Sequence, residues 1–152
     1  MKASFIAVLW LASNFAAGAA LAQTMPPNDA GVSMGHLHLN SADVAANKKI
    51  FVGMGGTANN VEGAPLQYVR FPGVVVILNL PSGAPPSSGP TAGTVINHVG
   101  FLVPNVQDAV AKWKAAGVPV LPGNNGRLDQ AFVATADGLR VEILEEIGRA
   151  HV

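Results

Sequence analysis

Three side chains that could bind a metal ion together stand at matching places in two similar segments of the chain. His36 and His98 each open one segment, 62 residues apart, and Glu142 closes only the second. Two imidazoles and one carboxylate on different strands form the facial arrangement that holds Fe(II), Mn(II) or a similar ion and leaves positions open for a substrate. This asymmetry suggests a metal site shared between duplicated halves.

The two segments match in role as well as in letters. Three roles recur at the same offset, namely a helix N-cap, a large core residue and a glycine stop. The pairs are Asp43 with Asn105, Phe51 with Trp113, and Gly55 with Gly117. The register then slips by three residues, so that Ile77 takes the place of Glu142 in the first half. Such a repeat argues for two copies of one supersecondary unit.

The apolar periodicity changes in the same order in both copies. It predicts a strand around each histidine, over 36–40 and 95–103, and then a helix, over 44–52 in the first copy and from Val106 to Ala116 in the second. Further strands are expected at 66–71, 74–80, 131–135 and 139–145. Each unit is therefore expected to be a strand, a helix and about three strands, in an α+β fold.

The first 22 residues belong to neither copy. A basic start, an apolar run too short to cross a bilayer and the small-residue sequence Ala20-Leu21-Ala22 predict a secretory signal peptide over 1–22. An uncleaved N-terminal anchor is the alternative. We therefore expect a periplasmic or secreted protein. With no cysteine in the chain, no disulfide contributes to its stability.

The rest of the chain divides by composition. A flexible leader (23–34), a first module (35–80), a linker rich in Pro, Gly and Ser (81–93), a second module (94–146) and a tail (147–152) are expected. Lys and Arg number 9, as do Asp and Glu, so neither nucleic acid nor an anionic membrane is an expected partner, and no stable membrane association is expected after cleavage. The expected ligand is a small molecule.

This duplicated unit, with a histidine on its first strand and a glutamate on its last, resembles the vicinal oxygen chelate superfamily. Its members include glyoxalase I, extradiol dioxygenases, bleomycin and fosfomycin resistance proteins and methylmalonyl-CoA epimerase. The segments that carry the resemblance are 35–40 with Asp43, 51–56, 97–101 and 137–142. The resemblance spans nearly the whole mature chain and implies two tandem βαβββ modules whose curled sheets form a cup with a divalent metal at its base.

The resemblance implies His36, His98 and Glu142 as the metal ligands. Taken singly, they could be an exposed strand residue, a core histidine and a surface carboxylate, but together they match the family pattern. Fe(II) or Mn(II) is favoured, with Zn, Ni or Co as alternatives. We expect one cup per chain, although relatives often pair as dimers with the site across the interface, so a homodimer is left open.

Further residues are expected near the metal. His38 faces the same side of its strand as His36 and is a candidate acid or base, with a solvated or structural side chain as the alternative. His36 is preferred as the ligand because its spacing to Asp43 matches that of His98 to Asn105. Gln67, Asn79 and Phe132 are expected to line a mixed substrate pocket.

Ile77 bears on the reaction. Glyoxalase I and the epimerase are similar in having a fourth ligand at this place, whereas extradiol dioxygenases have three, so a dioxygenase-like metalloenzyme is preferred. Phe132 and Ala136, however, stand where the dioxygenase signature has tyrosine and proline. A glyoxalase-like lyase or isomerase using His38, and a binding module without catalysis, are the alternatives. Thiol transfer of the fosfomycin type is the least favoured, because a cationic cup would need more arginines.

Overall fold

The computed structural model describes residues 26–60, 66–79, 89–91 and 93–146. The predicted signal peptide, the start of the leader at 23–25, most of the linker and the tail at 147–152 lie outside the described residues. Both α-helices within the described ranges have 10 residues, and no helix there is long and apolar enough to cross a bilayer.

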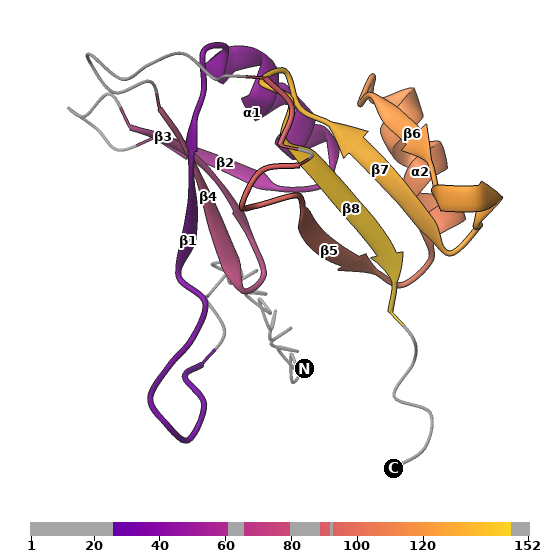
Figure 1. The fold of residues 1–152 in the computed structure, drawn as a ribbon. Coiled ribbons are helices and arrows are strands. Elements are labelled where there is room, and N and C mark those ends of the chain that lie inside the picture. Colours follow the sequence, from indigo (N-terminus) through magenta and orange to yellow (C-terminus); the bar gives the residue numbers. More distant parts are fainter. Residues whose placement is uncertain (1–25, 61–65, 80–88, 92, 147–152) are drawn as a thin grey trace, which may run out of the picture.

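Two four-stranded sheets repeat one strand order along the chain (Figure 1). The first contains β1 (His36–Asn40), β2 (Thr57–Asn60), β3 (Gln67–Phe71) and β4 (Val74–Asn79), in the order β1-β4-β3-β2. The second contains β5 (Val99–Val103), β6 (Val120–Pro122), β7 (Gln130–Ala134) and β8 (Arg140–Glu145), in the order β5-β8-β7-β6. Helices α1 (Val44–Gly53) and α2 (Val106–Ala115) follow β1 and β5. The predicted pair of βαβββ units is confirmed.

The two helices begin and end in the same way. The side chains of Asp43 and Asn105 each accept a hydrogen bond of 2.9 Å from the backbone amide three residues further on. Each contact satisfies a donor that the first turn of a helix leaves unpaired. Gly55 and Gly117, with φ of +100° and +76°, end the helices in the left-handed region that glycine adopts without strain. The predicted caps and stops are therefore confirmed.

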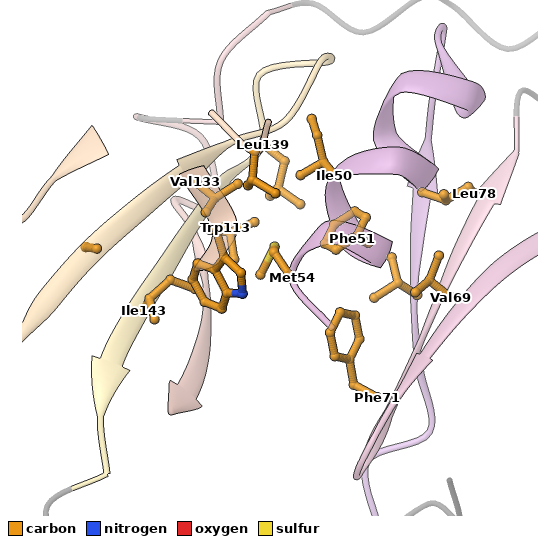
Figure 2. Packing of buried hydrophobic residues seen from close by; sticks show 14 of the residues in the cluster. Ile50, Phe51, Met54, Val69, Phe71, Leu78, Trp113, Val133, Leu139 and Ile143 are labelled. Atoms are coloured by element: carbon orange, nitrogen blue, oxygen red, sulfur yellow. The ribbon is translucent and has the colours of Figure 1, made fainter. Parts of the chain in front are cut away.

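One hydrophobic core joins the two modules. Phe51 of α1 is 1% exposed and Trp113 of α2 is 6% exposed, and Met54 lies between them (Figure 2). The rings of Phe71 and Phe101, one from each module, meet edge to face with their centroids 4.9 Å apart. The helix-facing sides of both sheets are buried in this core, so the opposite sides remain to face a ligand.

The second module differs from expectation at its start. The strand predicted from residue 95 begins only at Val99. The hydroxyl of Thr94 hydrogen-bonds to the carbonyl oxygens of Thr91 and Ile96, at 2.8 and 2.9 Å, and this turns the chain. The side chain of Val95 is consequently fully exposed. The apolar residues before His98 therefore do not extend the strand, because local hydrogen bonds compete with the ladder.

Candidate functional site

An ion pair on the second sheet brings together two of the predicted ligands. His98 directly precedes β5, and Glu142 of β8 stands opposite Gly100, two residues after the histidine. Residues two apart on a strand point to the same side, so both side chains leave the face turned away from α2. The His98 Nε2 and Glu142 Oε2 atoms are 2.9 Å apart, and the two side chains are 41% and 16% exposed. We call this side of the second sheet, around Glu142, the second cup face.

Hydrogen bonds hold both members of the pair. The Gln130 amide donates to the Oε1 atom of Glu142, and the Oε1 atom of Gln130 accepts from the Asn124 backbone amide at 2.8 Å. The His98 Nδ1 atom lies 3.0 Å from the Asn97 Oδ1 atom. An amide oxygen only accepts, so in this orientation of Asn97 the Nδ1 atom carries a hydrogen. The Nε2 and Oε2 atoms lie within hydrogen-bond distance, so a proton on either atom can be shared between imidazole and carboxylate.

An aromatic ring and a cation lie beside Glu142. Phe132 is the register partner of Glu142 and is 3% exposed. The guanidinium of Arg140, two residues before Glu142 on β8, lies over the Phe132 ring, with its Cζ atom 3.6 Å from the ring centroid. The structure thus places Phe132 on the second cup face. Sequence reasoning did not find Gln130, although its place two residues before Phe132 on one strand was the available signal.

An open cavity of about 540 Å³ adjoins Glu142. Its walls are mixed, as small-molecule sites commonly are. They comprise Leu102, Arg127, Asp129, Gln130, Glu142, Leu144, Glu145 and Glu146. Arg127 and Asp129 form an ion pair of 2.6 Å there, and the hydrogen bond from Arg127 lowers the pKa of the Asp129 carboxyl while the pKa of Arg127 is raised. Both groups are solvent-exposed, so this pair shapes the rim and contributes little to stability.

The other predicted histidines lie on the first sheet. His36 and His38 both leave the exposed side of β1, with their ring centroids 6.0 Å apart. Their register partners on β4 are Val75 and Ile77. Ile77 opposite His38 corresponds to Glu142 opposite Gly100, so the strand pairing agrees with the alignment of the two copies.

The two predicted pocket residues of the first module lie on opposite sides of the sheet. Asn79 stands on the same side of the sheet as His38, opposite Asn40. Gln67 leaves the other side, toward α1, where its Oε1 atom accepts a hydrogen bond of 3.2 Å from the Lys48 Nζ atom. The structure therefore places Gln67 beneath the helix, in contrast to the expectation that it lines the pocket.

The three predicted ligands are not brought together within one chain. His36 belongs to the first sheet, and His98 and Glu142 to the second. Within the described ranges, no group of three His, Asp or Glu side chains could hold a metal ion. A single chain thus brings together only two of the three side chains that the resemblance implies as ligands of the metal ion. The described residues of one chain therefore do not make a complete site for that ion.

Solved structures share this fold. A glyoxalase/dioxygenase from Nostoc punctiforme superposes with a TM-score of 0.56 at 18% identity, over 73% of this chain and 88% of that one. TnmS3, an antibiotic binding protein from Streptomyces sp. CB03234, gives 0.56 at 17% identity, over 75% and 95%. The hypothetical protein SA1046 from S. aureus gives 0.53 at 18% identity, over 76% and 93%.

Neither protein-family models nor curated proteins match the sequence. At identities below one fifth, the structural likeness establishes the fold alone, which this chain shares with a glyoxalase/dioxygenase, as the sequence resemblance implied. One fold hosts many reactions, so function has to be argued from the site.

Proposed function

We propose that the second cup face binds a small oxygen-bearing molecule, and that the His98–Glu142 pair moves a proton on it in a lyase or isomerase reaction. The observation that carries this proposal is a carboxylate held at both oxygens, by His98 and Gln130, beside an open cavity. A general base needs a fixed position within hydrogen-bond reach of its substrate. A neighbour of the same fold is a glyoxalase/dioxygenase, which agrees with this class of chemistry.

Each residue has a defined part in such a reaction. The pair takes a proton from a carbon next to a carbonyl group, which leaves negative charge on the carbonyl oxygen as an enolate. Arg140, on the same strand face, places a positive charge where it stabilises that oxygen. The carbon that loses the proton carries a hydroxyl group, so the enolate is an enediolate. The pair returns the proton to the former carbonyl carbon, the hydroxyl proton passes to the former carbonyl oxygen, and no oxidant or reductant is consumed. Leu102 and Leu144 give the cavity apolar walls.

A metal-dependent, dioxygenase-like enzyme is the second candidate, and one observation favours it. His98 Nε2 and Glu142 Oε2 are a nitrogen and an oxygen donor 2.9 Å apart, and the exposed His36 of a second copy could supply the third donor. Such a site would require a homodimer, with Fe(II) or Mn(II) as the favoured ion. His38 would then stand near the ion as the candidate acid or base.

Turnover and metal content separate these candidates. Protein dialysed against a chelator is assayed with hemithioacetals, and oxygen uptake with catechols is followed after loading with Fe(II) or Mn(II). Glu142→Gln and His98→Asn are compared with Asp108→Asn, a control that removes an exposed carboxylate on α2. Three results together support the proton-transfer proposal. Hemithioacetal turnover survives chelation, it falls by about a hundredfold or more in both site variants, and it persists in the control.

Other outcomes point elsewhere. Turnover unchanged in Glu142→Gln overturns the proton-transfer proposal. Three results favour the second candidate. Oxygen uptake needs bound metal, His36→Ala loses both metal and activity, and light scattering shows a dimer. Tight small-molecule binding with no turnover identifies a binding module. One structural neighbour, TnmS3, is an antibiotic binding protein.

Export is proposed from the sequence of residues 1–22. N-terminal sequencing of the protein recovered from a periplasmic fraction is expected to begin at Gln23. A chain that retains Met1 in the membrane fraction would instead identify the segment as an anchor.

A further inference from the structure

The side of the first sheet that faces away from α1 carries cationic and apolar side chains. Strand pairing aligns two rows across all four strands on this side. One row is His36, Val75, Arg70 and Thr57, and the next is His38, Ile77, Tyr68 and Asn59. The four strands contain neither Asp nor Glu. We call these two rows the first cup face.

Arg70 is the permanent cation of the first cup face, and no acidic side chain of the described residues forms an ion pair with it. Its guanidinium lies 5.7 Å from the centroid of the Tyr68 ring. The Arg70 Nε atom is shielded from water and has no hydrogen-bond partner, and the ion pairs formed by the described residues do not include Arg70. A shielded charged donor without an acceptor is unfavourable. An anion that binds Arg70 would remove this imbalance.

The spacing of the strands defines the size of the ligand. β4 separates Arg70 from His36, so their backbones are about 10 Å apart at a strand spacing of roughly 4.8 Å. Val75 forms the floor between them, and Ile77 continues it in the next row; both are partly buried. A flat apolar group fits this floor next to Tyr68. One permanent cation matches one negative charge, and the planar fork of a guanidinium matches a carboxylate.

We propose that the first cup face is a separate binding site for a small aromatic monocarboxylate. The carboxylate binds Arg70, and the ring lies on Val75 and Ile77 beside Tyr68. The first module provides all these residues, so the site requires neither the His98–Glu142 pair nor a second copy. The proposal therefore stands apart from the proton-transfer proposal and fails or succeeds independently of it.

Titration of the isotope-labelled full-length protein with sodium benzoate, followed by NMR, tests the proposal. We expect saturable shifts at the backbone amides of Val75 and Ile77. Benzyl alcohol, which has the ring without the charge, and acetate, which has the charge without the ring, should each bind at least about tenfold more weakly. Arg70→Gln should weaken benzoate binding by about tenfold or more, whereas Lys49→Gln, which removes an exposed cation from α1, should leave it within about twofold.

A second variant tests the proposal independently, in case Arg70→Gln does not fold. Val75→Glu keeps Arg70 but places a negative charge on the floor, and it should also abolish the benzoate shifts. Benzoate affinity that is unchanged in either variant overturns the proposal. Shifts confined to Gln130 and Glu142, or no saturable binding at ~10 mM benzoate, overturn it as well.

Discussion

A buried asparagine ties the two modules together, and its removal gives the sharpest stability prediction. Asn47 of α1 is 1% exposed. Its side-chain amide donates to the Ser41 hydroxyl at 2.8 Å and to the Asp137 carboxylate, and its oxygen accepts from the Ala136 backbone amide at 2.8 Å. Asp137 and Ala136 lie in the turn between β7 and β8. Asn47→Ala therefore removes three hydrogen bonds, two of them between modules.

The expected loss follows from these contacts. Each of the two neutral hydrogen bonds contributes about 1 kcal/mol and the one to the Asp137 carboxylate about 2 kcal/mol. Alanine is a better helix former than asparagine by about 0.6 kcal/mol, which offsets part of the loss. The free energy of unfolding should fall by about 3 kcal/mol, which corresponds to a Tm lower by roughly 10 °C for a domain of this size.

Equilibrium unfolding in urea measures this change. Lys49→Ala is the control because Lys49 is exposed on the same helix, and its effect should stay within about 0.5 kcal/mol. A double variant with Asp137→Asn should lose clearly less than the sum of the two single losses, because the two residues share a hydrogen bond. A loss below about 1 kcal/mol in Asn47→Ala would refute this view of the contact between modules.

Two further predictions concern the turn before β8 and the cavity rim. Gly138 has a φ of +84°, and a Cβ there would lie 2.9 Å from the Pro90 Cα atom, whereas Gly126 has a φ of +75° with nothing within 4 Å. Gly138→Ala should therefore cost about 2 kcal/mol and Gly126→Ala about 1 kcal/mol in urea unfolding, and equal losses would contradict the steric explanation. The second prediction rests on Asp129, because Arg127 lowers the pKa of this carboxyl in the folded state. The carboxylate therefore stabilises the folded protein at pH values above its unfolded pKa of about 3.9, and this stabilisation is lost as the pH falls through the lowered pKa. Asp129→Asn should be slightly less stable than the wild type at pH 7 and equal to it in strong acid, as thermal unfolding at several pH values would measure; a pH-independent difference would count against the ion pair.

Local signals in the sequence determined the elements of this protein. The side chains of Asp43 and Asn105 reach only three residues ahead, and the φ of Gly55 and Gly117 depends on the backbone at those positions. Such features are encoded within one turn of helix, so a repeat of their spacing predicts two copies of one unit. The alignment of Ile77 with Glu142 followed from the same repeat, and the strand pairing agrees with it.

Tertiary structure alone decided how the two copies share their side chains. Alternation along β3 places Gln67 and Tyr68 on opposite sides of the sheet, but only the packing of α1 shows that Lys48 covers the side with Gln67. The contact of Asn47 with Asp137 spans 90 residues and has no local signal. For the same reason the sequence could assign His36 to one module and His98 and Glu142 to the other, but it could not decide whether the open faces of the two sheets meet. A strand's period fixes which residues share a face, whereas the burial of the apolar faces in one common core decides what each open face meets.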